Sequence, residues 1–539
     1  MLFNSYVFLF AYLPITLAGF FLVAGLSQRA AGAWLIAASF VFYGWWNQVF
    51  CFFLATSIVF NYGVSLLIGK TADRPRWQER VLTAGVAINL LVLVYFKYLT
   101  WVIGLANEAF STSFDTGDIL LPLGISFFTF TQIGYLVDCA AGIARNRDPL
   151  NYGLFVTFFP HLIAGPILHN QEIMPQFGEA GTYRWSSTNF MVGSGIFVVG
   201  LLKKTLLADS ASTGIADAFA HPDALTLFAS WRTALSYSLQ LYFDFSGYSD
   251  MAIGLARMFN VVFPLNFNSP YKARSVIEYW QCWHMTLTRY LTRYVFTPLA
   301  RAALRRRRGQ RLPITVAAQR TVGGFCQMIA LPITVTMTLA GIWHGSGATF
   351  LVFGLLHSLY LCFNHAWRLV AENTKVARDR VSTRVVQVGL TYLCVLVASV
   401  FFRAPSVGSA MSLLAGMVGL HGSGPALPVS AAVFSGIAAA PFQAVADLGL
   451  IRVVAGWGET ASVASVLAWF AVMYGIVWIA PNTQQIFSAY APALEPSRPG
   501  SFAWPRFRAS APWAVVLGLA FALGFLSLGG TGEFLYFQF

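Results

Sequence analysis

Charged residues are scarce in this chain. Only 10% of its 539 residues are Asp, Glu, Lys or Arg, against about 25% in an ordinary soluble domain. Apolar runs of about 18 residues or more recur instead, each long enough to cross about 30 Å of hydrocarbon as a helix. They cover residues 5–25, 31–49, 50–69, 82–104, 119–143, 189–208, 233–256, 325–341, 347–366, 385–403, 463–480 and 512–529. We therefore predict an all-α polytopic membrane protein with about 11–13 transmembrane helices.

Cysteine is sparse in this chain, and the common catalytic sequence motifs are missing. The six cysteines are dispersed and form no C-x-x-C pair, which argues against structural disulfides and against a Cys/His metal site. The sequence has no G-x-S-x-G elbow, no P-loop and no dinucleotide fingerprint. We therefore expect no bound metal and no bound cofactor.

The basic residues lie mainly in short connections. The formal charge of +13 comes largely from residues 70–80, 145–148, 203–204, 305–311 and 376–384. Such connections are typical of topology signals that face an anionic membrane surface, and they do not indicate nucleic-acid binding. The first apolar run has no basic residue before Arg29. We expect a retained first helix and an extracytoplasmic N-terminus.

Two polar interruptions break the apolar pattern. Residues 155–177 combine three prolines with His161 and His169, so a single straight helix is excluded and a re-entrant segment is predicted. Residues 241–259 carry Asp244 and Asp250 in an apolar run. Six residues at about 100° each make two side chains of a helix face directions roughly 120° apart, so these carboxylates are not expected to form an acid/base dyad.

The segment 276–308 is too polar to span a membrane. Trp280, His284, Thr288 and Leu291 follow helical spacing, which predicts an amphipathic helix at the cytoplasmic interface or tucked into protein. Pro298 and the basic tail are expected to end it.

His344 is the first candidate catalytic residue. It lies in "LAGIWHGSGATF" (339–350), next to an apolar run and among glycines that permit close approach of a backbone or a ligand. Ionisable residues within membrane spans are functional candidates. A neutral imidazole can take a proton from a hydroxyl that attacks a carbonyl. A hydrogen-bonded structural histidine is the alternative.

His284 is the second candidate, because it lies beside Trp283 on the amphipathic segment. His357 is isolated in an apolar run, and His221 and His421 lie in polar loops. Cys282, two residues before His284, could act as a nucleophile that carries the transferred group covalently. This is the alternative to direct transfer from donor to acceptor with help from a histidine. The absence of a serine-nucleophile motif favours histidine-assisted direct transfer.

Five segments, in this order, carry a resemblance to a known family. They read "FFPHLIAGPI" (158–167), "YFDFSGYSDMAIGLARMF" (242–259), "NFNSPYKARS" (266–275), "EYWQCWHMTLT" (278–288) and "LAGIWHGSGATFLVFG" (339–354). Together they resemble the membrane-bound O-acyltransferase (MBOAT) family, and above all its bacterial alginate O-acetylation branch. The opening "MLFNSYVFLF" and the closing "FLYFQF" (534–539) also resemble that branch.

The resemblance implies one membrane domain over residues 1–539, with a motif-bearing core at about 119–366 around a central funnel or tunnel. It implies that an acyl group passes from a cytoplasmic thioester donor, acetyl-CoA or an acyl carrier protein, to an extracytoplasmic hydroxyl. The family's W-H-G histidine corresponds to His344, and a second important histidine corresponds to His284. The chain departs from the family pattern at Gln281 and Cys282, where relatives carry arginines, and at Thr292-Arg293, where they carry an Arg-Asp pair. We therefore expect recognition of the acyl donor to be the property in which this chain differs most from its relatives.

The resulting hypothesis is a multi-pass O-acetyltransferase of the bacterial cytoplasmic (inner) membrane that acts on an envelope polysaccharide. The expected partners are the lipid bilayer, the acyl donor, the polysaccharide acceptor and a separate extracytoplasmic acetyltransferase, for which "FLYFQF" is a candidate contact. Residues 420–460 are expected to form an extracytoplasmic loop. The alternatives are D-alanyl transfer from a carrier protein to teichoic acid, protein acylation, and a transporter or flippase.

Overall fold

The protein is described here from a computed structural model that covers residues 1–115, 117, 119–144, 147–371, 381–423, 463–496, 504–528 and 535. These residues contain helices and connections and no strand. The predicted loop at 420–460 lies outside the described residues except for its first four positions. The chain forms two compact units, 1–201 with 247–265 and 483–521, and 202–246 with 266–482 and 522–539.

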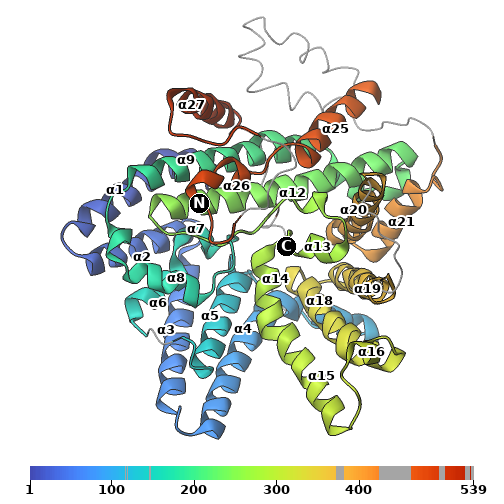
Figure 1. The fold of residues 1–539 in the computed structure, drawn as a ribbon, viewed down its shortest axis with the longest axis horizontal. Helices are drawn as coiled ribbons and strands as arrows, with labels where there is room; N and C mark the ends of the chain where they lie inside the picture. The colour runs from blue at the N-terminus through green and yellow to red at the C-terminus, as the bar shows by residue number, and fades with distance from the viewer. Residues whose placement is uncertain are drawn as a thin grey trace, which may run out of the picture. The chain divides into compact units, whose positions relative to one another are not determined.

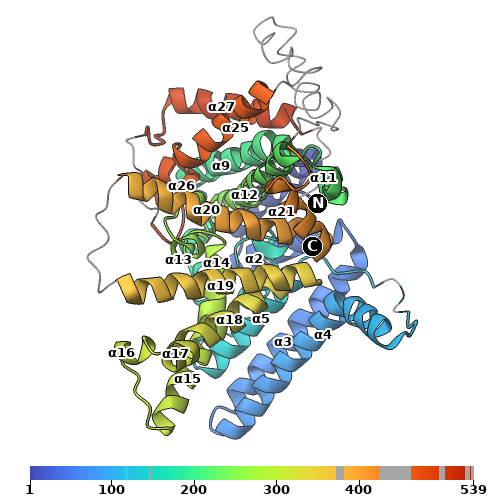
Figure 2. The ribbon, with the colours of Figure 1, turned by 90° about the vertical axis from the view of Figure 1, so that its right-hand side faces the viewer.

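The first unit is built mainly from the N-terminal helices. Their bounds are η1 (Phe8–Tyr12), α1 (Leu13–Ala24), α2 (Gln28–Gly44), α3 (Gln48–Lys70), α4 (Pro75–Phe110), α5 (Ile125–Ala140), α6 (Pro149–Thr157), α7 (Phe159–Leu162), α8 (Asn170–Gly178), η2 (Ala180–Tyr183), α9 (Ser187–Leu202), α26 (Thr483–Ile486), η8 (Ser488–Tyr490) and α27 (Ala511–Leu526). α3 and α4 lie side by side as an antiparallel pair (Figures 1 and 2). Asn61 and Asn89 join them through a buried amide pair at 2.7 and 3.1 Å.

The second unit carries both candidate histidines. Its helices are η3 (Lys203–Ala208), α10 (Asp209–Ser212), α11 (Ile215–Ala220), η4 (Pro222–Ala224), the first part of α12 (Leu227–Met258), η5 (Pro270–Lys272), α13 (Val276–Trp280), α14 (Met285–Leu291), η6 (Thr292–Phe296), α15 (Thr297–Gly309), α16 (Val316–Gln319), α17 (Val322–Phe325), η7 (Cys326–Ala330), α18 (Leu331–His344), α19 (Ala348–Ala371), α20 (Val381–Arg403), α21 (Val407–Met417) and α25 (Val463–Trp478). η3, η6 and η7 are π-helical turns, and η2, η4, η5 and η8 are 3₁₀ turns.

The structure confirms the predicted membrane-protein architecture. Every predicted apolar run corresponds to a helix, and six helical stretches of the described chain are long and apolar enough to cross a membrane. The interrupted stretch 155–177 is split over α6, α7 and α8, as its prolines require. The two aspartates also diverge as expected. Asp244 accepts from Lys204, whereas Asp250 accepts from Thr483.

Three sequence expectations are wrong. The segment 276–308 is not one continuous helix, because α13 ends at Trp280 and α14 begins only after His284. Pro298 does not end the helix, because it takes the second position of α15, after the π-helical turn η6, and α15 continues to Gly309. The helix runs without a break from η6 into α15, so Pro298 lies within a longer helical stretch, and the π-helical turn before it is the kind of distortion that accompanies a proline inside a helix.

The third correction concerns the basic pair at 203–204, which is not a loop signal. Lys204 is buried in η3, and its ammonium pairs with Asp209 at 2.8 Å and with Asp244 at 2.7 Å. A buried ammonium needs such partners, because desolvation of an isolated charge is costly. The backbone N–H of Leu535 also donates to Asp244, at 2.9 Å, and Leu535 is buried.

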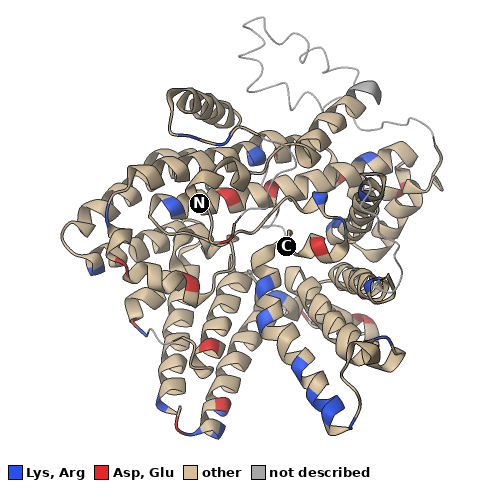
Figure 3. Cartoon of the chain, in the orientation of Figure 1, with Lys and Arg blue, Asp and Glu red and all other residues tan. Residues whose placement is uncertain are grey.

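The arginines of α15 cluster towards its C-terminal end, which Figure 3 shows as a run of blue. Arg305, Arg306 and Arg308 are exposed, in keeping with the predicted basic connection. Arg307 is buried, and its guanidinium donates to the Pro313 carbonyl and to Gln327. This arginine therefore holds the connection after α15 against η7.

Candidate active site

The two candidate histidines lie close together in the second unit. Their ring centroids are 6.2 Å apart, with an interplanar angle of 52°. His284 is fully buried and His344 is 6% exposed. His344 ends α18 and His284 precedes α14, so the pair is made by the end of one helix and the start of another.

α18 reaches this position because it packs very closely on α19. A Cβ on Gly341 would lie 2.3 Å from the Phe350 carbonyl oxygen, and one on Gly354 would lie 2.5 Å from the Met337 carbonyl oxygen. Side chains at these positions would force the two helices apart. Figures 1 and 2 both show α18 beside α19. The glycines near His344 thus permit close approach of a neighbouring helix, one of the two roles expected from the sequence.

Aromatic rings surround the His344 imidazole. The centroid of Trp343 lies 5.0 Å from that of His344, Phe402 lies at 5.1 Å, and Phe353 at 6.2 Å. The Phe402 and Phe353 contacts are edge-to-face, the arrangement that aromatic pairs favour. These rings come from α18, α19 and α20 and hold the imidazole in an apolar environment.

His284 occupies a strained turn between α13 and α14. Its backbone has φ 41° and ψ 51°, a left-handed conformation that costs a non-glycine residue roughly 1–2 kcal/mol. Backbone hydrogen bonds on both sides hold the turn. The N–H of Met285 donates to the Asn266 carbonyl, and the N–H of Asn268 donates to the Cys282 carbonyl, both at 2.9 Å.

Asn266 fixes which nitrogen of His284 carries the proton. Asn266 Oδ1 lies 3.0 Å from His284 Nδ1, 2.9 Å from the Thr286 hydroxyl and 3.4 Å from the Thr286 backbone nitrogen. A backbone N–H can only donate, so the Asn266 atom that faces it is the carbonyl oxygen. His284 Nδ1 must then donate, and the neutral ring keeps its lone pair on Nε2.

His284 Nε2 is buried and has no hydrogen-bond partner among the described residues. Burial also lowers the pKa of His284 to about 3, so the imidazole is neutral at physiological pH. The result is a buried nitrogen whose lone pair can accept a hydrogen bond from a bound molecule.

Sequence reasoning missed Asn266 as a functional residue. It lies in the motif "NFNSPYKARS", but its link to His284 spans a loop and a short helix. Cys282 is buried beside this turn. Gln281, one of the departures from the family pattern, is exposed.

His357 forms a different kind of site. It is 1% exposed, and its Nδ1 accepts a hydrogen bond from Trp280 Nε1 at 3.2 Å. Its ring is stacked on Tyr279 and meets Phe353 edge-to-face. This histidine therefore bridges α13 and α19.

Comparison with known proteins places this chain in a family. A model of the MBOAT, membrane-bound O-acyltransferase family, matches residues 139–317. The chain is 36% identical over 450 residues to a peptidoglycan O-acetyltransferase of Helicobacter pylori, covering 78% of this chain and 80% of that protein. The chain belongs to the membrane-bound O-acyltransferase family. Membership makes this membrane protein an acyltransferase rather than a transporter.

Two further relatives of this MBOAT protein bear on its substrate. A "Probable alginate O-acetylase AlgI" of Azotobacter vinelandii is 36% identical over 423 residues, covering 77% of this chain and 78% of the relative. A teichoic acid D-alanyltransferase of Bacillus subtilis is 25% identical over 247 residues, covering 45% of this chain and 58% of that enzyme. The MBOAT chain is thus similar over a longer stretch to O-acetylating relatives.

Proposed function

We propose that the protein is an O-acetyltransferase that moves an acetyl group from a cytoplasmic thioester to a hydroxyl of an extracytoplasmic envelope polysaccharide. The observation that carries the proposal is the pair of buried histidines whose ring centroids lie 6.2 Å apart, with a lone pair held on His284 Nε2. The acetyl group and the polysaccharide class come from the relatives described above.

In the proposed reaction, His344 is the general base. The acceptor oxygen forms a bond to the thioester carbonyl carbon, and the carbon–sulfur bond breaks. His344 takes the hydroxyl proton during attack and returns it to the departing thiolate, so that ester and free thiol are the products. The C-terminal end of α18 carries partial negative charge, which favours the positive charge that the base acquires.

His284 has a different role in this proposal. The attacking hydroxyl has one proton, which goes to His344, so the Nε2 lone pair of His284 accepts a hydrogen bond from a neighbouring donor group of the acceptor. This contact positions the acceptor so that its attacking oxygen faces the thioester. The surrounding Trp343 and Phe245 rings, with centroids 6.1 and 4.8 Å from that of His284, keep bulk water away. Exclusion of water limits hydrolysis of the activated acyl group.

The proposed topology places the N-terminus outside the cytoplasm and makes the chain multi-pass in the cytoplasmic membrane. Donor and acceptor then approach the histidines from opposite faces. The donor is acetyl-CoA or an acyl carrier protein. The acceptor hydroxyl that attacks at the histidines is the first to carry the acetyl group, and a separate extracytoplasmic acetyltransferase then transfers that group to the polymer.

The test is the content of alkali-labile acetate on envelope polysaccharide. A deletion strain is complemented with the wild type, His344→Ala, His284→Ala or the exposed-loop control His221→Ala, at equal membrane abundance. We expect rescue by the wild type and by the control, and failure of both site variants. Unchanged acetate in the deletion strain would overturn the assignment. Ester-linked D-alanine lost in place of acetate would support the teichoic acid alternative.

A further inference from the structure

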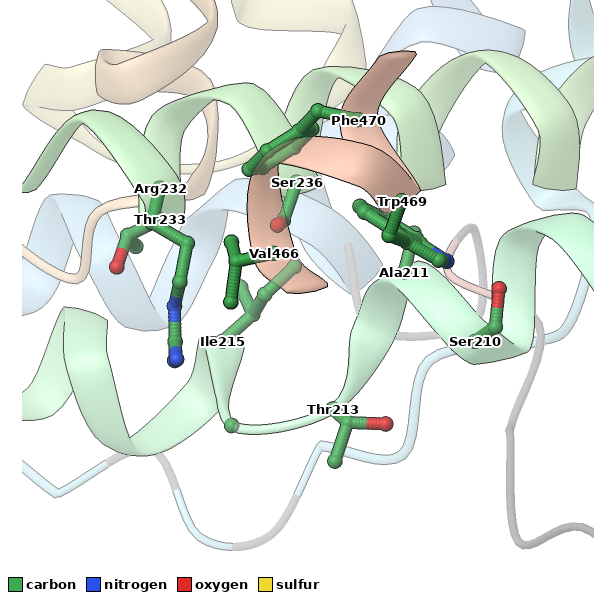
Figure 4. A pocket seen from close by; sticks show the side chains of 11 residues that line it. Ser210, Ala211, Thr213, Ile215, Arg232, Thr233, Ser236, Val466, Trp469 and Phe470 are labelled. Atoms are coloured by element: carbon green, nitrogen blue, oxygen red, sulfur yellow. The ribbon is translucent and has the colours of Figure 1, made fainter. Parts of the chain in front are cut away.

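A large apolar groove lies on the first unit, which holds neither of the two candidate histidines. It runs between α1, α9 and α27 and contains about 780 Å³ of free space, within the range of ordinary ligand pockets, about 300–1,000 Å³. The recess of the second unit that Figure 4 shows, with Ser210, Arg232 and Trp469 in its wall, contains only about 30 Å³, about the volume of one water. The groove can therefore admit part of a ligand molecule, whereas the recess cannot.

The wall of the groove is almost entirely apolar. Among the residues that line it there is no Asp, Glu, Lys or Arg, and Ser194 carries its one hydroxyl group. Phe21, near the end of α1, meets Trp185 just before α9, with ring centroids 5.2 Å apart. Phe8, just before α1, meets Phe197 of α9, with centroids 6.5 Å apart. The two helices therefore run antiparallel along a wall that favours a hydrocarbon ligand.

A further wall comes from α27. A Cβ on Gly195 would lie 3.2 Å from the Leu517 side chain, so the absence of a side chain lets α27 pack on α9 (Figures 1 and 2). Phe521, one turn further along α27, lines the groove. On α1 the lining extends from Leu9 to Leu22, a helical rise of about 20 Å. Two opposed acyl chains make up the bilayer core of about 30 Å, so the groove is long enough for one chain.

One end of the groove carries a positive charge. Arg184 directly precedes Trp185 and is exposed, and within the described residues its guanidinium forms no ion pair and no hydrogen bond. The Asn260 amide donates to the Arg184 carbonyl at 2.7 Å and so holds this end of the groove in place. Trp185 is 56% exposed, and tryptophan is enriched at the headgroup level of membranes. An anionic headgroup would supply the partner that the guanidinium lacks.

We propose that the groove binds one acyl chain of an anionic phospholipid whose phosphate pairs with Arg184. A guanidinium suits this phosphate because it donates two parallel hydrogen bonds to it. The chain covers the apolar wall, and Trp185 lies at the boundary between chain and headgroup. This lipid is part of the packing of the first unit, and its binding is independent of the proposed acyl transfer.

The test uses the full-length protein in phosphatidylcholine nanodiscs that contain a trace of photoreactive lipid. The probe is phosphatidylglycerol or phosphatidylcholine with a diazirine near the end of one acyl chain, and labelled peptides are mapped by mass spectrometry. In the wild type we expect phosphatidylglycerol to label α1 and α9 about fivefold more than phosphatidylcholine does, roughly the contribution of one arginine near a headgroup. Arg184→Gln is expected to remove this preference. The matched control is Arg76→Gln, an exposed arginine of the first unit, which should label as the wild type does.

A second variant tests the groove itself. Ala18 is exposed and lines the groove, so Ala18→Trp fills space without disturbing the buried core. We expect this variant to lower labelling of α9 by both lipids about tenfold or more, because each CH₂ that the indole displaces contributes about fourfold to binding. Ala37→Trp, at an exposed position of α2 outside the groove, is the matched control and should label normally.

Four results would overturn the inference. They are equal labelling of the groove by both lipids in the wild type, an undiminished preference in Arg184→Gln, undiminished labelling of α9 in Ala18→Trp, and labelling of α4 as strong as that of the groove. α4 exposes apolar side chains such as Leu91 without lining the groove, so the last result would indicate an unspecific lipid coat. No acyl donor is present, so the expected labelling of a protein that transfers no acetate would leave the groove intact and overturn the proposed function alone.

Discussion

His284 and His357 are equally buried in the same unit, yet their hydrogen bonds are opposite. His284 donates from Nδ1 to the Asn266 carbonyl and keeps a lone pair on Nε2. His357 accepts on Nδ1 from the Trp280 indole, so its proton is on Nε2. Nε2 of His284 is therefore left as a hydrogen-bond acceptor, and Nε2 of His357 is left as a donor.

This difference shows that burial alone does not indicate which ring nitrogen of a histidine is left to accept a hydrogen bond. Both rings are desolvated and both lie among aromatic side chains. The partner on Nδ1 decides whether the opposite nitrogen can take a proton. In this protein the Asn266 carbonyl accepts from His284 Nδ1, which leaves Nε2 unprotonated, whereas the Trp280 indole donates to His357 Nδ1, which leaves Nε2 protonated.

The largest expected effect comes from replacing the two histidines by the same residue. Glutamine cannot act as a base at neutral pH, which removes the role of His344. Its flexible side chain also does not hold an acceptor atom where the contact with Asn266 holds His284 Nε2. We expect His284→Gln and His344→Gln to lower the transfer rate about 10²–10⁴-fold, and His357→Gln to change it less than about threefold. The measurement is acetyl transfer in membrane vesicles at matched protein abundance. An equal loss in all three variants would contradict the comparison.

A smaller effect is expected from the residues that bond to Nδ1. Asn266→Ala removes the acceptor and frees the His284 proton to occupy Nε2, so we expect kcat to fall about 10- to 100-fold with little change in KM. The matched variant is Trp280→Phe, which removes the partner of His357 and should leave kcat nearly unchanged. A purely structural role for Asn266 would instead lower abundance and leave kcat per folded molecule intact.

The pH dependence sharpens the same contrast. Since the pKa of His284 is about 3, its Nε2 stays unprotonated above that value, and we expect no loss of activity from this group between pH 5 and 8. Asn266→Asp places a carboxylate beside the ring, stabilises the imidazolium and raises the pKa. Activity of this variant should therefore fall as the pH drops through the raised pKa. Initial rates across the pH range would reveal the new acid limb, and an unchanged profile would argue against the contact.

The smallest effect is expected at Cys282. Direct transfer needs no thiol, so Cys282→Ala should keep the rate within about twofold, and mass spectrometry of the intact protein after donor addition should show no acyl adduct. Loss of activity together with a wild-type adduct on Cys282 would favour a covalent intermediate.

Much of the fold could be predicted from the sequence, because long apolar runs leave few alternatives to helices. The two candidate histidines could also be predicted from the sequence, because an ionisable side chain within or beside an apolar run is a functional candidate. The break in the helix before His284 could not be predicted from the sequence. Helical spacing is kept by Trp280, His284, Thr288 and Leu291, although the backbone turns between α13 and α14. Asn266 and the Lys204–Asp244 pair were also missed, because each depends on contacts between distant segments.

The account's central claim is that His284 and His344 act as one catalytic unit. The most direct measurement is the acetyl-transfer rate of purified His284→Gln, His344→Gln and the double variant in nanodiscs, each corrected for folded protein. If the imidazoles act together, the double variant should be about as slow as the slower single variant, because either loss disables the unit. Losses that multiply in the double variant would show that the two histidines work independently, and would contradict the account.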